Sequence, residues 1–271
     1  MLHNHVSSIA TAEHRRQHIR REFERHAVPF QFSDAQTPSE PLKEHIRNLL
    51  PQLASAPLTD GEKACFISHI LLWHDCIQQN LPYIAVFEDD VVLGKRSADF
   101  LCDDAWLKQR FADGEAFIIR LETFLMPVKS RPCNIADHGG SQFKLADSVH
   151  WGAAAYILSQ AAARKLLADF AQLDGKELDA VDMLMFNRYF NDPTLTVYQI
   201  SPAVCIQEPQ LHRQHSTLNS QLEDERYQNQ QKLKQAAAQN NRKTLKQRIL
   251  RALTKPARMR EKRRYHIIPF E

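Results

Sequence analysis

The stretch Pro82–Leu93, PYIAVFEDDVVL, decides the fold. It begins with an unbroken apolar run over 83–87, rich in branched and aromatic residues, which predicts a strand buried on both faces, as central parallel strands are. The next three residues are acidic: Glu88, Asp89 and Asp90. These carboxylates stand at the carboxyl end of the strand, which is the edge of an open α/β sheet where ligands bind.

Three carboxylates cannot be desolvated at a sheet edge without a counter-charge. Side chains alternate along a strand, so we expect Glu88 and Asp90 on one side and Asp89 on the other. The simplest counter-charge is a divalent cation that bridges to phosphate oxygens, because hard oxygen ligands suit Mn²⁺ or Mg²⁺. A solvated acidic turn is the alternative, and the apolar strand in front of the acids favours the cation.

Length and composition predict one α/β domain followed by a tail. The chain has 271 residues, of which 43% are hydrophobic, and we place the main domain at 1–220 and the tail at 221–271. No segment approaches the roughly 18 apolar residues of a membrane span, and the first residues lack a signal-peptide core, so we expect a cytoplasmic protein. The five cysteines show no CxxC spacing, which argues against a structural zinc site and a disulfide framework.

Charged residues accompany two short strands predicted near the amino terminus. Arg15 and Arg16 open a helix predicted over 12–26. A helix dipole disfavours cations in the first turn, so the pair is either solvated or placed to meet an anion such as a nucleotide phosphate. Asp34 follows a strand predicted at 29–32 and is the type of residue that hydrogen-bonds a ribose or a base. A turn aspartate is the alternative.

A capping box predicts the start of a helix that runs from Thr59 to about Asn80. In this motif the side chains of Thr59 and Glu62 each accept a hydrogen bond from an orphan backbone amide. The helix carries a broad apolar stripe with His69 on or beside it. A lone histidine on such a stripe is more often a packed core residue than a catalyst. This helix leads directly into the acidic strand, however, so His69 is a candidate to support the site.

A second buried strand, predicted at 116–121, also ends in charged residues. Arg120 and Glu122 are placed there either to orient the cation ligands and the substrate or to form a structural ion pair. Further along, Trp151 and Gly152 precede another predicted strand. A glycine lets backbone approach a ligand closely, and Trp151 offers a flat apolar face to a sugar ring. Core packing is the competing interpretation of both.

Two later segments supply the remaining candidates. Asp182 lies at the amino end of a helix predicted at 183–190, where an acid is a common cap. His212 and His215 lie in an irregular stretch, 202–220. Either histidine could complete a metal shell, and we take His212 as the candidate; an exposed loop histidine is the simpler interpretation.

The end of the chain is strongly basic. Between Arg242 and Arg264 there are eleven lysines and arginines against the single acid Glu261. Apolar residues recur among them at roughly helical intervals, which favours an interfacial helix on anionic lipid, where each basic residue contributes about 1 kcal/mol. Nucleic-acid binding and a solvated tail are the alternatives. The segment has no interleaved aromatic residues suited to base stacking, so we expect the membrane surface and no nucleic acid.

Several segments together resemble the bacterial lipooligosaccharide galactosyltransferases of glycosyltransferase family 25. The segments are CFISHILLW, PYIAVFEDDVVL, FIIRLET, HWGAAAYILS, AVDMLMF and the closing IIPFE. The resemblance extends over essentially the whole chain. It implies a GT-A type fold, an α/β nucleotide-binding domain with a central, mostly parallel sheet, and inverting transfer of galactose from UDP-galactose in β-1,4 linkage to a terminal N-acetylglucosamine or glucose. Such an enzyme is expected on the inner face of the inner membrane.

The resemblance also implies roles for the candidate residues. Mn²⁺ or Mg²⁺ is expected on Asp90, with Glu88 and His212 as further ligands. The base that deprotonates the acceptor is expected at Asp182, by its place in the general GT-A layout, and the acceptor is expected at Trp151 and Gly152. The donor is assigned to charged residues of predicted helices and strand ends: Arg15, Arg16, Asp34, His69, Glu88, Asp89, Arg120 and Glu122.

Two residues depart from the family pattern. Ser7 replaces a branched apolar residue of the first strand, and His14 replaces the acid before the arginine pair. Both lie where the resemblance places the uridine end of the donor.

Three other functions are compatible with parts of the sequence. Another UDP-sugar transferase of the same fold is one of them. A nucleotidyltransferase would need a glycine-rich phosphate loop, which this chain with seven glycines lacks. A basic adaptor or nucleic-acid-binding protein with a degenerate site is the third, and it would show salt-sensitive nucleic-acid binding without turnover.

Overall fold

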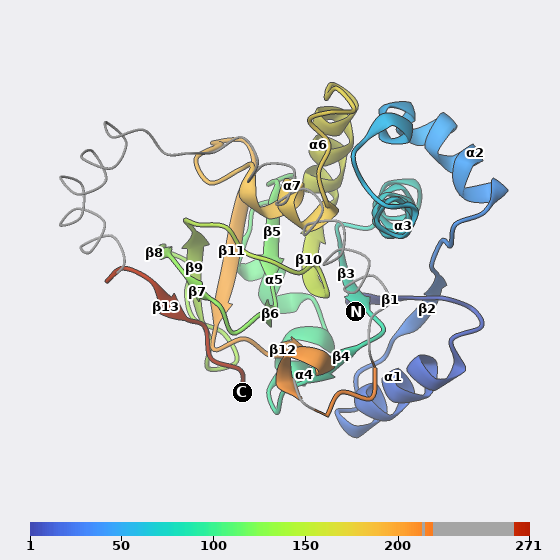
Figure 1. The fold of residues 1–271 in the computed structure, drawn as a ribbon. Coiled ribbons are helices and arrows are strands. Elements are labelled where there is room, and N and C mark those ends of the chain that lie inside the picture. Colours follow the sequence, from blue (N-terminus) through green and yellow to red (C-terminus); the bar gives the residue numbers. More distant parts are fainter. Residues whose placement is uncertain (213–214, 219–262) are drawn as a thin grey trace, which may run out of the picture.

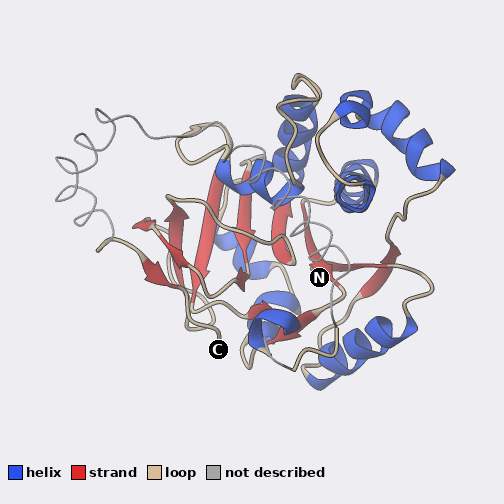
Figure 2. Cartoon of the chain, viewed as in Figure 1, coloured by secondary structure: helices blue, strands red, loops and turns tan. Residues whose placement is uncertain are grey.

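A computed structural model describes residues 1–212, 215–218 and 263–271. The predicted domain boundary at 220 and most of the predicted basic tail therefore lie outside the described residues. In the described part, one large sheet lies at the centre of the molecule with helices on both of its faces (Figures 1 and 2).

The central sheet has eight strands in the order β2-β1-β3-β10-β5-β11-β9-β8. Their bounds are β1 His3–Ser8, β2 Gln31–Asp34, β3 Tyr83–Glu88, β5 Phe117–Arg120, β8 Ser130–Pro132, β9 Gln142–Ala146, β10 Ala155–Ser159 and β11 Thr196–Ser201. The pairings give β1, β2, β3, β5, β8 and β11 one direction and β9 and β10 the other. The sheet is thus mixed but mostly parallel, as predicted, and β10 separates the two parallel halves.

The helices divide into two layers, one on each face of the sheet. One layer contains α2 (Glu40–Leu49), the 3₁₀ helix η1 (Pro51–Ser55), α3 (Asp60–Gln78), α6 (Gln160–Phe170) and α7 (Val181–Asn187). The other contains α1 (Glu13–Arg25), α4 (Ser97–Leu101) and α5 (Ala105–Arg110). A short helix, α8 (Glu208–Leu211), follows the sheet. Each layer packs its apolar side chains against the sheet to form a separate core.

Strand β3 contributes to both cores, as its apolar sequence predicts. Ile84 and Val86 belong to the core under α3, whereas Ala85 and Phe87 belong to the core under α1. All four side chains are fully buried. Burial of one large apolar side chain stabilises a fold by roughly 1.5–3 kcal/mol, so β3 fixes the sheet from both faces. The carboxylates that follow it are therefore held on a rigid strand.

The capping box predicted at the start of α3 is confirmed, since Thr59 and Glu62 form it. Ser159 caps α6 by accepting a hydrogen bond from the Ala162 amide at 3.1 Å. The apolar residues of 98–111 predict a single helix, but the chain forms α4 and α5 with a break between them. In the break, the Asp103 carboxylate accepts the amide hydrogen of Ala105 at 2.8 Å, a local bond that competes with a continuous helix.

Short strands close the lower part of the molecule in Figure 1. Strands β4 (Val91–Leu93), β12 (Cys205–Gln207) and β6 (Glu122–Thr123) form a small sheet below the site. Strand β13 (His266–Ile267) pairs with β7 (Pro127–Val128), so the end of the chain, which was predicted as tail, packs against the body. The loop predicted at 126–140 is partly wrong, because β7 and β8 lie within it. Across the described ranges, no helix is both long and apolar enough to span a membrane.

Candidate active site

A cavity of about 730 Å³ opens at the carboxyl ends of β1 and β3, beside the start of α3. This volume is within the range of small-molecule sites. The cavity is lined by residues from five segments: Ser7, Ser8, Ile9, Ala12, Arg15, Ala35, Gln36, Thr37, Pro38, Asp60, Gly61, Ala64, Cys65, Ser68, His69, Glu88, Asp89, Asp90 and Gln207. The predicted carboxylates of β3 therefore face a cavity large enough for a ligand.

Arg15 meets three acids at this cavity: Glu88, the last residue of β3, and the next two residues, Asp89 and Asp90. We call these four residues the carboxylate cluster. The Arg15 guanidinium lies 2.5 Å from an Asp89 carboxylate oxygen and 3.7 Å from Asp90. Ser8, at the end of β1, donates a hydrogen bond of 2.7 Å to the other Asp89 oxygen. Two adjacent parallel strands and α1 thus hold Asp89 in place. Arg15 pairs with protein carboxylates here, and its contact with a nucleotide phosphate stays a prediction.

Glu88 and Asp90 lie on the same side of the chain, as strand alternation predicts. The Gln207 amide bridges them, with its nitrogen 3.2 Å from Glu88 Oε2 and 3.4 Å from Asp90 Oδ1. Asp90 is 3% exposed. Its burial and the neighbouring Glu88 charge raise the pKa of Asp90 to about 8. Without a cation the Asp90 carboxyl therefore keeps its proton at pH 7, because burial and Glu88 disfavour its charged form.

The donor set of this cluster fits a hard divalent cation. It offers carboxylate oxygens from three neighbouring residues, and Arg15 is the cation seen to pair with them among the described residues. When burial and a like charge raise the pKa of a carboxyl group, a nearby cation stabilises its ionised form most strongly. Oxygen ligands select Mn²⁺ or Mg²⁺ over softer metals. Asp90 and Glu88 are the residues that would hold the ion.

His69 reaches the cavity from α3 and is held from behind. Its Nδ1 lies 2.8 Å from the Tyr156 hydroxyl, which also accepts a hydrogen bond of 2.9 Å from the Trp73 indole. Its Nε2 lies 3.8 Å from Glu88 Oε1. The supporting position predicted for His69 is therefore confirmed. Tyr156 was missed because it lies in β10, far along the chain, and looks like an ordinary core residue of a strand.

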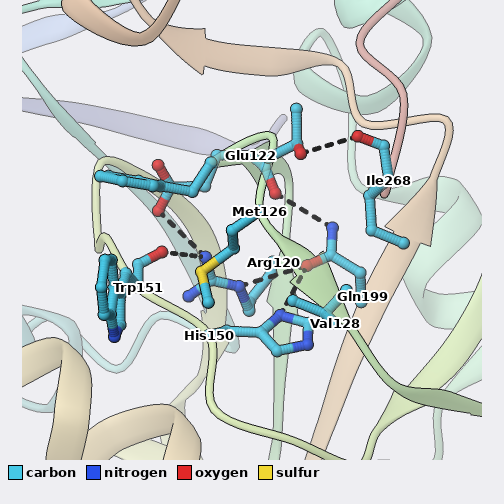
Figure 3. Close-up of a pocket in the computed structure, with 10 residues that line it drawn as sticks. Arg120, Glu122, Met126, Val128, His150, Trp151, Gln199 and Ile268 are labelled. Carbon is cyan, nitrogen blue, oxygen red and sulfur yellow. Dashed lines mark hydrogen bonds and ion pairs between the residues drawn. The ribbon is translucent and has the colours of Figure 1, made fainter. Parts of the chain in front are cut away.

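Arg120 and Glu122 lie in a second group of polar side chains, which we call the arginine cluster and which also contains His150 and Gln199 (Figure 3). Arg120 lies 3.5 Å from Glu122, donates to Gln199 at 3.2 Å, and donates at 2.8 Å to each of the carbonyls of Trp151 and Gly152. The adjoining space is only about 10 Å³, enough for one water molecule. The structure thus shows Arg120 and Glu122 as a structural ion pair, the second of the two predicted roles. Neither residue lines the large cavity.

Burial dominates the electrostatics of the arginine cluster. Desolvation raises the pKa of Glu122 to about 8 despite the attraction of Arg120, and the charges of Glu88 and Asp90 add to the rise. Desolvation and the Arg120 charge lower the pKa of His150 to about 3. His150 is thus neutral at pH 7. The influence of Glu88 and Asp90 on Glu122 also shows that the two clusters lie within electrostatic reach.

Trp151, Gly152 and Asp182 lie together beside the arginine cluster. Trp151 is half-exposed and meets the edge of Phe124 at a centroid distance of 5.9 Å. Gly152 has φ +83°, a conformation that other residues rarely adopt, and its amide donates to Asp182 at 2.9 Å. Asp182 is 4% exposed. The three residues predicted for the acceptor side are therefore neighbours.

The remaining predicted residues lie apart from the cavity. Arg16 pairs with Asp34 and lies over the Phe32 ring at 4.7 Å, so these two charges meet each other at the end of β2. His212 is exposed at the end of α8. The structure does not bring it to the described cavity lining, and its role as a metal ligand stays a prediction. Sequence reasoning missed Ser8, Cys65 and Gln207, which local patterns do not mark as site residues.

Comparison with known proteins gives the family. Residues 1–185 match the model of glycosyltransferase family 25, described as an LPS biosynthesis protein. The chain belongs to glycosyltransferase family 25. It is therefore an enzyme, a glycosyltransferase of lipooligosaccharide biosynthesis.

This family 25 chain has similar relatives over its full length. It is 45% identical over 278 residues to the lacto-N-neotetraose biosynthesis glycosyltransferase LgtB of Neisseria meningitidis serogroup B, covering 100% of both chains. It is 41% identical to the lipooligosaccharide biosynthesis protein lic2B of Haemophilus influenzae, covering 98% of both. The solved inositol-1-phosphate CTP transferase of T. maritima gives a TM-score of 0.37 at 8% identity, over 76% of this chain and 89% of that one. That score is too low to carry an argument, so the GT-A assignment stays a prediction.

Proposed function

We propose that this glycosyltransferase transfers galactose from UDP-galactose, with inversion, to a terminal N-acetylglucosamine or glucose of lipooligosaccharide in β-1,4 linkage. One observation carries the proposal: a 730 Å³ cavity with three carboxylates and Arg15 at one wall. The names of its relatives support the choice of product, since LgtB is named as a glycosyltransferase of lacto-N-neotetraose biosynthesis. The donor and the linkage are the parts of the proposal that need testing.

In this proposal the large cavity holds the nucleotide end of the donor. Asp90 and Glu88 are the residues that would hold Mn²⁺ or Mg²⁺, and Asp89 keeps Arg15 in place. When bound, the cation stabilises the negative charge that grows on the departing diphosphate. Gln207 aligns the two ligand carboxylates through its bridging amide. Glu88 and Gln207 lie in strands, and Asp89 and Asp90 lie in the turn between β3 and β4. These groups are thus positioned before charge develops.

The acceptor sugar binds at the opposite side, on the exposed face of Trp151. Aromatic rings suit sugar faces because both are flat and partly apolar. Asp182 takes the proton of the attacking hydroxyl while that oxygen bonds to the anomeric carbon and the bond from carbon to phosphate oxygen breaks. Its carboxylate is oriented by the Gly152 amide at 2.9 Å. The proton thus moves to a carboxylate outside the cation site.

We propose that the basic tail, 221–271, brings the enzyme to the anionic inner face of the inner membrane, where its lipid-linked acceptor lies. The eleven basic residues of 242–264 support this step. Binding to vesicles of phosphatidylglycerol that falls with added salt is expected, and equal binding to neutral vesicles would remove it.

The decisive experiment supplies the purified enzyme with a panel of UDP-sugars, Mn²⁺ and simple glucoside or N-acetylglucosaminide acceptors. The expected result is a β-1,4-galactoside, formed from UDP-galactose and identified by NMR of the product. Asp182→Asn is expected to lower turnover by about 10²–10⁴-fold with unchanged UDP binding. Transfer of a different sugar would reject the donor assignment, and near-normal turnover of Asp182→Asn would reject the base.

A further inference from the structure

A second set of metal-ligand side chains lies on the wall of the large cavity. Cys65 and His69 are one turn apart on α3, so both side chains point to the same side of the helix. Glu88 ends β3 opposite them. One ligand atom from each residue lies within 4.8 Å of the other two. All three residues also line the cavity.

This set differs chemically from the oxygen ligands of Asp90. A thiolate, an imidazole and a carboxylate form the mixed sulfur, nitrogen and oxygen set that suits Zn²⁺, with the fourth tetrahedral position left open. We propose that Cys65, His69 and Glu88 form a binding site for Zn²⁺ or another thiophilic divalent cation. The cysteine spacing in the sequence argued against zinc because the site takes one cysteine only, and its partners come from a helix and a strand.

His69 is already oriented as a metal ligand would be. Its side chain is 1% exposed, and its ring stacks on Tyr156 with the centroids 5.7 Å apart. The Tyr156 hydroxyl lies 2.8 Å from Nδ1 and can accept its hydrogen. Metal-binding histidines have their other ring nitrogen held in this way. Nε2, on the side of Glu88, is then the nitrogen available to the cation.

The two carboxylate oxygens of Glu88 face different neighbours, Gln207 and His69. Oε2 accepts the Gln207 amide at 3.2 Å, whereas Oε1 lies 3.8 Å from His69 Nε2. Binding needs a contraction of the ligands toward about 2.0–2.3 Å from the ion. The Cys65 thiol gives its proton to solvent as the metal–sulfur bond forms. The thiolate and the carboxylate then balance the two charges of the cation.

Because Glu88 serves both sets, zinc here would compete with the manganese of the transfer reaction. This consequence rests on the proposed function, but the binding site does not. We therefore expect zinc to inhibit the enzyme through Cys65.

The test titrates untagged protein with Co²⁺, a spectroscopic substitute for Zn²⁺. The expected result is a thiolate-to-cobalt absorption band that saturates at one ion per chain and disappears when Zn²⁺ is added. Cys65→Ser should lose the band. Cys133→Ser, whose half-buried sulfur lies in another part of the fold beside the Phe143 carbonyl, should keep it. A band that persists in Cys65→Ser, or no band in the native protein, would overturn the site.

A second measurement uses the native protein and so does not depend on whether a variant folds. The rate at which iodoacetamide alkylates Cys65, followed by peptide mass analysis, should fall at least about tenfold with Zn²⁺, and the rate at Cys102 should not change. An unchanged rate at Cys65 would overturn the proposal. Neither measurement needs a sugar nucleotide or turnover, so failure of the galactosyltransferase assignment would leave this result unaffected.

Discussion

The protein has two clusters of charged side chains at the ends of nearby strands, and they differ in charge balance and in access. The carboxylate cluster places three acids and Arg15 at the wall of a 730 Å³ cavity. The arginine cluster pairs Arg120 with Glu122 beside a space of about 10 Å³. The first therefore has three carboxyl groups for one arginine and room for a ligand, whereas the second uses its hydrogen bonds within the fold.

The difference predicts a catalytic role for one cluster and a structural role for the other. Carboxyl groups that face a cavity can bind a substrate or a cation, so substitutions there should affect turnover. A buried ion pair fixes the backbone around it, and here Arg120 holds the Trp151 and Gly152 carbonyls, beside the proposed acceptor site. Changes there should affect stability first. The following substitutions test this separation.

The largest effect is expected for Asp90→Asn in the carboxylate cluster. Loss of the main cation ligand should lower kcat/KM by about 10³-fold or more and should abolish the Mn²⁺ dependence of UDP binding. Stability should not fall, because one of three crowded carboxylates becomes neutral. Transfer kinetics and urea unfolding measure the two effects, with the exposed Asp113→Asn as control. Near-normal turnover, or a clear loss of stability, would contradict the separation.

Arg120→Met should instead act on stability. It leaves the Glu122 carboxyl buried without its ion-pair partner and removes two donors to backbone carbonyls, so the free energy of unfolding should fall by about 3–5 kcal/mol. Arg20→Met, at an exposed pair with Glu13, should cost less than about 1 kcal/mol. Urea unfolding measures both. Equal losses at the two positions would show that Arg120 is not a buried structural group.

Glu122→Gln should change the pH dependence of stability. The pKa of Glu122 rises from 4.5 to about 8 on folding, so the folded state binds more protons than the unfolded state between these values. Glu122 therefore makes stability fall as pH rises through this window, by up to about 1.4 kcal/mol per pH unit. The glutamine variant should lose this slope when unfolding is followed at several pH values. The exposed Glu44→Gln should keep it, and an identical slope in both variants would contradict the shift.

The smallest effect is expected for Trp151→Ala. The indole is half-exposed and contacts Phe124. Its loss should remove about 1.4 kcal/mol of stacking energy with the acceptor sugar and so raise the acceptor KM by about tenfold. The KM for the donor and the stability should be unchanged. Trp151→Phe should recover most of the affinity. An effect on donor KM alone would place the tryptophan at the other substrate.

The sequence predicted the elements whose signals are local. The capping box at Thr59 and the serine cap at Ser159 act within three residues, and the apolar run of β3 needs burial on both faces wherever it lies. The side of the chain shared by Glu88 and Asp90 follows from strand alternation alone. These features depend on neighbours in the sequence and were therefore visible in it.

Contacts between distant segments were not visible. Gln207 bridges the carboxylates of Glu88 and Asp90, 119 and 117 residues earlier in the chain, and Tyr156 supports His69 from a strand 87 residues later. The direction of β10, antiparallel to β3 and β5, also leaves no local pattern. In the sheet β10 lies between β3 and β5. It separates the end of β5, where Arg120 lies, from the carboxylates of β3, and the sequence gives no sign of this separation.

Gly152 sets a limit on protein engineering of the acceptor side. A Cβ at this position would lie 3.1 Å from a Glu122 oxygen and 3.3 Å from the Phe124 ring, on backbone with φ +83°. Any other side chain would therefore press on Glu122 of the arginine cluster and on the Phe124 ring together. A mutant library aimed at new acceptors should vary Phe124 and Trp151, whose side chains reach the surface, and should keep residue 152 constant.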